Sequence, residues 1–421
     1  MDLIEFISQC TSPFHTVDTA VKMLAGNGFE ELPLTDDWNN IKTDRGYFTK
    51  VYGSTLIAFI AHDNLRGGLR IAASHTDFPC FKVKPNADIV QDGYGKLNVE
   101  VYGGMIVNTW LDRPLSLAGK VALRGDDVFC PKTRLVDFDR PLMTIPNLAI
   151  HMDRKINEGK ALNRQKELLP LAFMTGERKA DYLLELLAKE LGCRKDDILS
   201  YELYAYQWEK GCRLGFEDEF ISSPRLDNLT SVKACLEGIL ADKRDEGLDA
   251  AVLFDNEEVG SRTKQGGASM VLSNVLERIY LGRGLTRQDL LADIHKGFML
   301  SIDVAHALHP NYPEKNDITN KPVLNGGTAI KTAAGQSYAG DAEAVAAVKA
   351  LCKKHGIPYQ QYVNRSDIPG GSTLGSIAST LLPVRTMDIG IPILAMHSAR
   401  ETMGASDQDS LERLVKAFFA E

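Results

Sequence analysis

Two adjacent glutamates, Glu257 and Glu258, follow the apolar run Ala250–Phe254, and this arrangement constrains the fold more than any other stretch. The apolar run predicts a buried strand. Consecutive side chains at a strand end point in different directions, so one glutamate could bind a metal ion while its neighbour transfers a proton. The alternative is that both are solvated turn residues, the commoner fate of an acidic pair. The other strand ends bear on this choice.

Three more predicted strands end on side chains that can bind a metal ion: Leu69–Ser74 before His75, Phe298–Ile302 before Asp303, and Met387–Ala395 before His397. In open α/β sheets, ligands bind at the edge where the parallel strands end. Asp77, two residues beyond His75, can orient that histidine as a hydrogen-bonded carboxylate. Taken alone, His75 would be a satisfied surface histidine, but the coincidence of several such strand ends favours a metal site.

Asp227 precedes the predicted helix Leu229–Leu240 and adds a further carboxylate. Considered alone, it would serve as the N-cap of that helix. Together with the strand-end residues, it could bridge two metal ions. Two histidines and several carboxylates form a ligand set that suits zinc and is plausible for manganese or cobalt. The sequence therefore predicts a two-metal hydrolytic site.

The composition is that of an ordinary globular chain: 421 residues, 44% hydrophobic and 25% charged, enough for two or more domains. The net charge of −8 argues against a nucleic-acid or membrane-surface partner. Apolar runs are too short to cross a bilayer, and the acidic start Met1–Ile7 differs from a signal peptide. Seven scattered cysteines without a CxxC pair fit reduced thiols, so we expect a cytoplasmic protein.

The pattern of hydrophobic and polar residues changes between residues 81 and 221. Short alternating strands such as Lys96–Tyr102 and Leu117–Leu123 are separated there by glycine turns. This pattern predicts a β-rich domain inserted into an α/β chain. We expect one domain from residues 1–80 and 222–421, and a second from residues 81–221.

Several motifs resemble those of the M18 metallopeptidases, the aspartyl aminopeptidase family. Those in the α/β part are His75–Asp77, Ser223–Asn228, Asp255–Ser261, Asp303–Tyr312 and Met396–Ser398. Those in the inserted part are Tyr102–Gly104, Thr109–Arg113 and Leu115–Gly119. The resemblance spans nearly the whole chain. It implies a mixed-sheet α/β/α di-zinc peptidase domain with an inserted β-rich dimerisation domain, assembled into a large homo-oligomer, commonly a dodecamer.

The resemblance also implies roles for the metal-site residues. The metal ligands would be His75, Asp227, Glu258, Asp303 and His397. Asp227 would bridge two divalent ions, zinc or else cobalt or manganese, and which terminal ligands share a metal stays open. Glu257 would be the general base, and Asp77 would orient His75.

Three further residues align with positions near the substrate in this family. His306 and Lys331 would lie close to the peptide, and His151 would reach the active site of a neighbouring subunit. The implied activity is removal of an N-terminal residue from peptides. Lys331 and His306 are the candidates for recognising an acidic side chain, because a buried carboxylate needs a cation or strong donors.

The sequence departs from the usual family pattern at Phe78, Asn108 and Asn147, where polar or basic residues are usual. These changes leave a neutral or hydrophobic preference as an alternative to an acidic one. A related di-metal carboxypeptidase, deacylase or glutamyl aminopeptidase is a second alternative, against which the inserted-domain motifs argue. A third alternative is a catalytically inactive assembly protein that binds metals only for structure. The intact Glu257 argues against it.

Overall fold

The computed structural model describes residues 1–176, 181–368 and 370–421, and these residues form two compact units. The first unit comprises Met1–Asp77, Gly211–Met396 and Glu401–Glu421. The second comprises Phe78–Lys210 and the short segment His397–Arg400. Most of the second unit is therefore one continuous insertion between two parts of the first.

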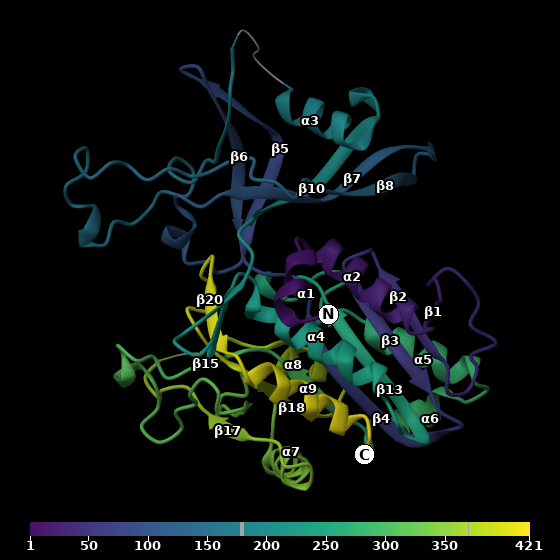
Figure 1. Ribbon diagram of the computed structural model, residues 1–421. Coiled ribbons are helices and arrows are strands. Elements are labelled where there is room, and N and C mark those ends of the chain that lie inside the picture. Colours follow the sequence, from purple (N-terminus) through teal and green to yellow (C-terminus); the bar gives the residue numbers. More distant parts are fainter. Residues whose placement is uncertain (177–180, 369) are drawn as a thin grey trace. The chain divides into compact units, whose positions relative to one another are not determined.

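The first unit is built on a nine-stranded mixed sheet (Figure 1). In spatial order its strands are β1 (Glu30–Glu31), β2 (Gly46–Val51), β3 (Thr55–Ala61), β13 (Glu246–Phe254), β4 (Asn64–His75), β14 (Phe298–Ile302), β18 (Arg385–Gly390), β16 (Thr328–Lys331) and β17 (Tyr359–Tyr362). The four central strands β13, β4, β14 and β18 run parallel. Their carboxyl ends therefore meet at one edge of the sheet.

Helices pack on both faces of this sheet, because its central strands are apolar on both sides. The helices of the first unit are α1 (Leu3–Gln9), α2 (Pro13–Gly26), α4 (Leu226–Leu240), α5 (Val271–Gly282), α6 (Arg287–Ile294), α7 (Ala342–Lys354), α8 (Leu374–Leu381) and α9 (Asp407–Phe418), with short 3₁₀ turns η4 (Glu257–Val259) and η5 (Pro313–Lys315). α4 and α9 pack together on one face, and α5, α6 and α8 cover the other (Figure 1). The predicted mixed-sheet α/β/α architecture is confirmed.

A second, five-stranded sheet in this unit was not predicted. Its strands, in spatial order, are β11 (Cys212–Leu214), β12 (Phe220–Ser223), β20 (Glu401–Gly404), β19 (Pro392–Leu394) and β15 (Ala305–His306). The strand expected over residues 387–395 is in fact divided between the two sheets, as β18 and β19. The break falls at Ile391, immediately before Pro392, which lacks an N–H for a sheet interior.

The second unit contains a six-stranded antiparallel sheet (Figure 1). Its strands, in spatial order, are β8 (Cys130–Asp137), β7 (Leu115–Asp127), β10 (Ile198–Gln207), β5 (Cys80–Gln91), β6 (Tyr94–Tyr102) and β9 (Leu171–Met174). Helix α3 (Tyr182–Leu191) packs beside β5 and β8, and the 3₁₀ turns are η1 (Val107–Trp110), η2 (Ile156–Glu158) and η3 (Lys195–Asp197). In neither unit does a described helix have the length and apolar character needed to cross a bilayer.

Candidate metal centre

The parallel strands β4 and β13 bring the first candidate ligands together. They pair in a register that sets His75 opposite Phe254, so both strands leave the sheet at the same edge. β14 lies on the other side of β4, and Asp303 follows its last residue. This is the edge at which α/β sheets bind ligands.

His75 lies at the centre of a group of carboxylates. Its Nε2 atom lies 3.5 Å from Asp227 Oδ1, 3.7 Å from Asp303 Oδ1 and 4.0 Å from Glu257 Oε2. The Nδ1 atom lies 3.0 Å from the backbone carbonyl oxygen of Asp77, to which it can donate its proton. That hydrogen bond leaves Nε2 directed at the carboxylates, in the arrangement found for histidines that bind metals.

Asp77 has a role that its position in the sequence does not reveal. Its carboxylate accepts the backbone N–H groups of both Glu257 and Glu258, each at 3.1 Å. Asn256 immediately before them has a left-handed backbone with φ of 64°, which turns the chain into η4. Asp77 thus fixes the turn that carries the glutamate pair, and it faces His75 Nδ1 through both its backbone carbonyl at 3.0 Å and its side-chain Oδ1 at 3.4 Å.

Two overlapping groups of ligand atoms share the histidine. His75, Asp227 and Asp303 form one, and His75, Glu257 and Glu258 form the other. Within each group the ligand atoms all lie within 4.8 Å of one another. One imidazole and several carboxylates form a nitrogen and oxygen set that suits a divalent cation such as zinc. The residues present therefore fit the metals that the sequence predicts.

The electrostatics of this group also favour a cation. Burial lowers the pKa of His75, but hydrogen bonds with Asp227, Asp303 and Asp77 outweigh burial and raise that pKa well above its ordinary value. The pKa of Glu257 is raised to about 8, chiefly by burial; His75 opposes the rise, and the carboxylates of Asp303 and Asp77 add to it. Crowded carboxylates raise one another's pKa because their negative charges repel. Positive charge placed among them relieves this repulsion.

Two residues that sequence reasoning missed support the site. Glu401, which is 2% exposed, accepts the N–H of Asp227 at 3.1 Å. Asp255 is buried before the glutamate pair, where burial and the neighbouring Asp77 raise its pKa to about 7. The place of Asp255 beside the pair was a usable signal. Glu401 lies 174 residues from Asp227 and gave no signal in the sequence.

The other predicted residues lie in different surroundings. His306 is an exposed residue of β15, and its ring centroid lies 6.1 Å from that of Tyr362. Lys331, at the end of β16, is only 1% exposed. His151 is exposed in a turn of the second unit. His397 belongs to the segment grouped with that unit, where its Nδ1 lies 3.0 Å from the carbonyl oxygen of Gly104, so its part in the metal site stays a prediction.

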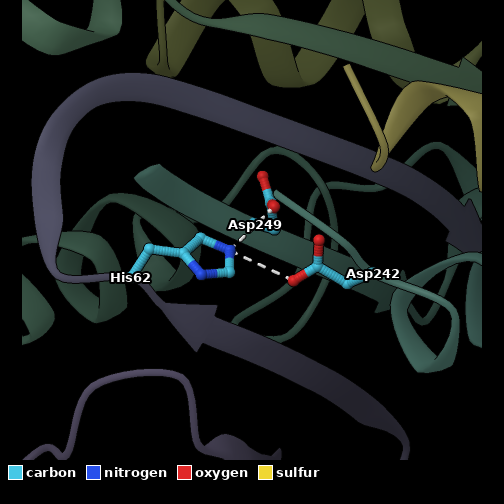
Figure 2. A group of neighbouring side chains, drawn as sticks. All are labelled: His62, Asp242 and Asp249. Atoms are coloured by element: carbon cyan, nitrogen blue, oxygen red, sulfur yellow. Dashed lines mark hydrogen bonds and ion pairs between the residues drawn. The ribbon is translucent and has the colours of Figure 1, made fainter. Parts of the chain in front are cut away.

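A second histidine–aspartate group lies at the opposite end of β13 (Figure 2). His62 Nε2 lies 3.1 Å from both Asp242 Oδ2 and Asp249 Oδ2, and Nδ1 lies 2.7 Å from Asp44 Oδ1. Arg244 donates its backbone N–H to Asp242 Oδ1 at 3.0 Å and its guanidinium to Asp249 Oδ1. Because these carboxylates already face the imidazole, the Arg244 guanidinium and a backbone N–H, the geometry favours an internal ion-pair network, with a protonated imidazole, over a metal site.

This network predicts a stability that depends on pH. Burial lowers the pKa of His62, but Asp242, Asp249 and Asp44 outweigh it and raise the pKa from 6.5 to about 10. Because the folded state binds the proton more tightly, the stabilisation is fully present below pH 6.5 and is lost as pH rises toward 10. His62→Gln should cost about 3 kcal/mol below pH 6.5, the scale for removing one member of a buried ion pair.

The measurement is the free energy of unfolding of wild type and His62→Gln across this pH range. Comparing the two proteins cancels the titration of groups that they share. The difference should shrink steadily above neutral pH. A difference that is constant from pH 6 to pH 10 would show that His62 is not held protonated.

The chain is similar to known proteins along almost its whole length. A family model described as aminopeptidase I zinc metalloprotease (M18) matches residues 6–419. The "Probable M18 family aminopeptidase 2" of Clostridium novyi is 47% identical over 423 residues, covering 99% of this chain and 98% of that protein.

Solved structures show the same similarity. A chain in the cryo-EM structure of the Ape4 and Nbr1 complex superposes with a TM-score of 0.95 at 33% identity, covering 99% of this chain and 84% of that one. The S. cerevisiae mApe1 dodecamer gives a TM-score of 0.86 at 26% identity, with coverage of 99% and 95%.

Proposed function

The chain belongs to the M18 family of zinc metallo-aminopeptidases, and from that premise we propose that it uses two metal ions to release an acidic residue from the N-terminus of peptides. The observation that supports the metal part is the set of carboxylates gathered around His75. The proposed ligands are His75, Asp227, Glu258, Asp303 and His397, with Asp227 as the bridge. Zinc is the first choice of metal, and cobalt or manganese also suit these ligands.

The proposed chemistry assigns proton transfer to Glu257. Bound divalent metal lowers the pKa of water and polarises the peptide carbonyl. Glu257 takes a proton from the attacking water and delivers it to the leaving amine, as a general base and then a general acid. The Asp77 carboxylate accepts a hydrogen bond from the backbone N–H of Glu257 at 3.1 Å, which keeps the base in place.

The proposed acidic preference rests on a basic cavity in the first unit. A hollow of about 470 Å³ is lined by His306, His309 and Lys315 among other residues, and by Arg365, whose guanidinium also pairs with Asp367. It lies on the chain segments that follow Asp303 and precede His397. Positive and titratable groups can pair with the carboxylate of an N-terminal Asp or Glu. A neutral or hydrophobic preference is the alternative, because Phe78, Asn108 and Asn147 replace polar or basic residues.

We further propose that residues 81–221 form a dimerisation domain within a cytoplasmic homo-oligomer, a dodecamer like the solved S. cerevisiae relative. His151 would reach the active site of a neighbouring subunit. Large apolar side chains flank it: Leu148 is 43%, Ile150 49% and Met152 75% exposed. Three such neighbours on one exposed loop favour burial against another chain.

The test is hydrolysis of aminoacyl substrates carrying Asp, Glu, Leu or Lys, with a matched N-blocked set. The free-amine Asp and Glu substrates should give the highest kcat/KM, and chelation should abolish hydrolysis until zinc, cobalt or manganese is added. Metal content and particle size are measured on the same preparation. Cleavage of N-blocked peptides, or full activity without metal, would contradict the two-metal aminopeptidase. Faster cleavage of Leu substrates would contradict the acidic preference but not the enzyme class. An active monomer would contradict an active site shared between subunits.

A further inference from the structure

The peptide group between Ile302 and Asp303 is hydrogen-bonded on both sides. Its N–H, which belongs to Asp303, donates to the carbonyl oxygen of Ile389 at 2.9 Å. Its carbonyl oxygen, which belongs to Ile302, accepts a hydrogen bond from the side-chain Nδ2 of Asn228 at 2.9 Å. A peptide group is planar, and in the trans form its N–H and C=O point in opposite directions. The two bonds therefore fix the plane from which the proposed ligand Asp303 leaves β14.

The Asn228 amide takes the place of a strand partner at the end of β14. The pairing of β14 with β4 ends at Ser301, so the Ile302 carbonyl lies just beyond that ladder. A proposed metal ligand lies next to each end of the bond, because Asp227 precedes Asn228 in the chain. Asp303 likewise follows Ile302. One hydrogen bond thus joins two ligand-bearing segments whose bonded residues are 74 positions apart.

The burial of Asn228 is explained by this bond. The residue is 0% exposed, and its Oδ1 atom has no hydrogen-bond partner among the residues that the structure describes. Burying an amide costs free energy unless hydrogen bonds within the protein replace those to water. A side chain that served packing alone would be apolar. The polar group at this position therefore acts through the carbonyl that its Nδ2 atom holds.

We propose that Asn228 is a positioning residue that fixes Asp303 relative to Asp227 and keeps their carboxylates together at one site. This inference rests on the proposed function, in which both aspartates are metal ligands. One oxygen of each belongs, with His75, to a group of ligand atoms that all lie within 4.8 Å of one another. Two carboxylates this close repel each other, so the backbone must hold them together until a cation binds. Glu401 holds one segment through the Asp227 N–H, and Asn228 holds the other.

The test compares Asn228→Leu and Asn228→Ala with a matched control, Gln408→Leu. Leucine has nearly the shape of asparagine without the donor, and alanine removes the amide without adding bulk. Gln408 is also buried, 7% exposed, and its Nε2 donates to the carbonyl oxygen of Thr230 at 3.1 Å, a bond that adjoins no proposed ligand in the chain. Zinc affinity is measured by competition with a chromogenic chelator, and folding by thermal melting. Both Asn228 variants should bind zinc about 10–100-fold more weakly, the usual cost of losing a residue that supports a metal ligand, and Gln408→Leu should bind it as wild type does.

A double-mutant cycle separates positioning from general damage. Because Asn228 acts by placing Asp303, its loss should cost nothing further once Asp303 itself cannot bind metal. Asn228→Ala should therefore leave zinc affinity unchanged in an Asp303→Ala background. In a Glu258→Gln background, where Asp303 is intact, the same change should lower zinc affinity by its full factor.

The outcomes that contradict this role are distinct. Unchanged zinc affinity in a folded Asn228 variant, or an equal loss in the Asp303→Ala background, would overturn the inference. Failure of both Asn228 variants to fold would overturn it too, because the amide would then hold the fold as a whole. A wild type that holds no metal would instead overturn the proposed function.

Discussion

Glu257→Gln should lower kcat by about 10²–10⁴-fold, the contribution of a positioned general base, while the protein keeps its metal. The amide has nearly the shape of the carboxylate but cannot accept a proton from water. Glu257 Oε2 lies 4.0 Å from His75 Nε2, among the other carboxylates, and the Asp77 carboxylate fixes its backbone. The substitution should therefore remove the proton acceptor without moving its neighbours. Single-turnover kinetics and metal content of the purified variant measure the two effects separately.

The matched control is the same substitution at the adjacent position. Glu258→Gln should lose metal as well as rate, because Glu258 is the proposed ligand of the pair. Both variants keep the backbone N–H groups that donate to Asp77, so the turn itself should be preserved. Near-normal turnover of Glu257→Gln, or equal metal loss in both variants, would show that the division of roles between the two glutamates is wrong.

Asp227→Ala should abolish hydrolysis and leave the protein short of metal. This residue is the proposed bridge between the metals. Its loss should therefore lower metal affinity by more than the factor of about 10–100 that follows loss of a residue supporting a metal ligand. Its Oδ1 atom lies 3.5 Å from His75 Nε2, and its N–H is held by Glu401. Metal content by elemental analysis and residual kcat/KM in added zinc are the measurements.

A buried aspartate elsewhere in the first unit controls for general damage. Asp242→Ala removes a partner of His62 in the ion-pair network at the other end of β13. It should lower the melting temperature and leave metal content unchanged. If Asp227→Ala kept two metals per chain, or regained full activity in excess zinc, Asp227 would not be the bridge.

Much of the first unit could be predicted because its strands are long apolar runs that end on polar residues. Periodicity located β4, β13 and β14, and the rule for parallel sheets set their carboxyl ends at one edge. His75, Glu257, Glu258 and Asp303 follow from these strand ends, and the structure places their ligand atoms in two overlapping groups.

The remainder depended on contacts between distant parts of the chain. The five-stranded sheet consists of short strands drawn from residues 212–404, too short for a periodicity to show. Glu401 reaches Asp227 through that sheet, since β20 pairs with β12. The two carbonyl partners of Lys331, at Asp303 and Val304, likewise lie far from it in the sequence. Hydrogen bonds of this kind leave no pattern in the local sequence.

The single carboxylate that accepts the amides of both Glu257 and Glu258 has a consequence for metal choice. Because Asp77 accepts both N–H groups, one carboxylate holds the backbone of the two residues together. In the proposed metal site, an ion that displaced the backbone at Glu258 would displace that of Glu257 as well, and would change the distance over which a proton must travel. Under that proposal, exchanging one metal for another should alter the rate in two ways at once, through the acidity of bound water and through the alignment of its proton acceptor.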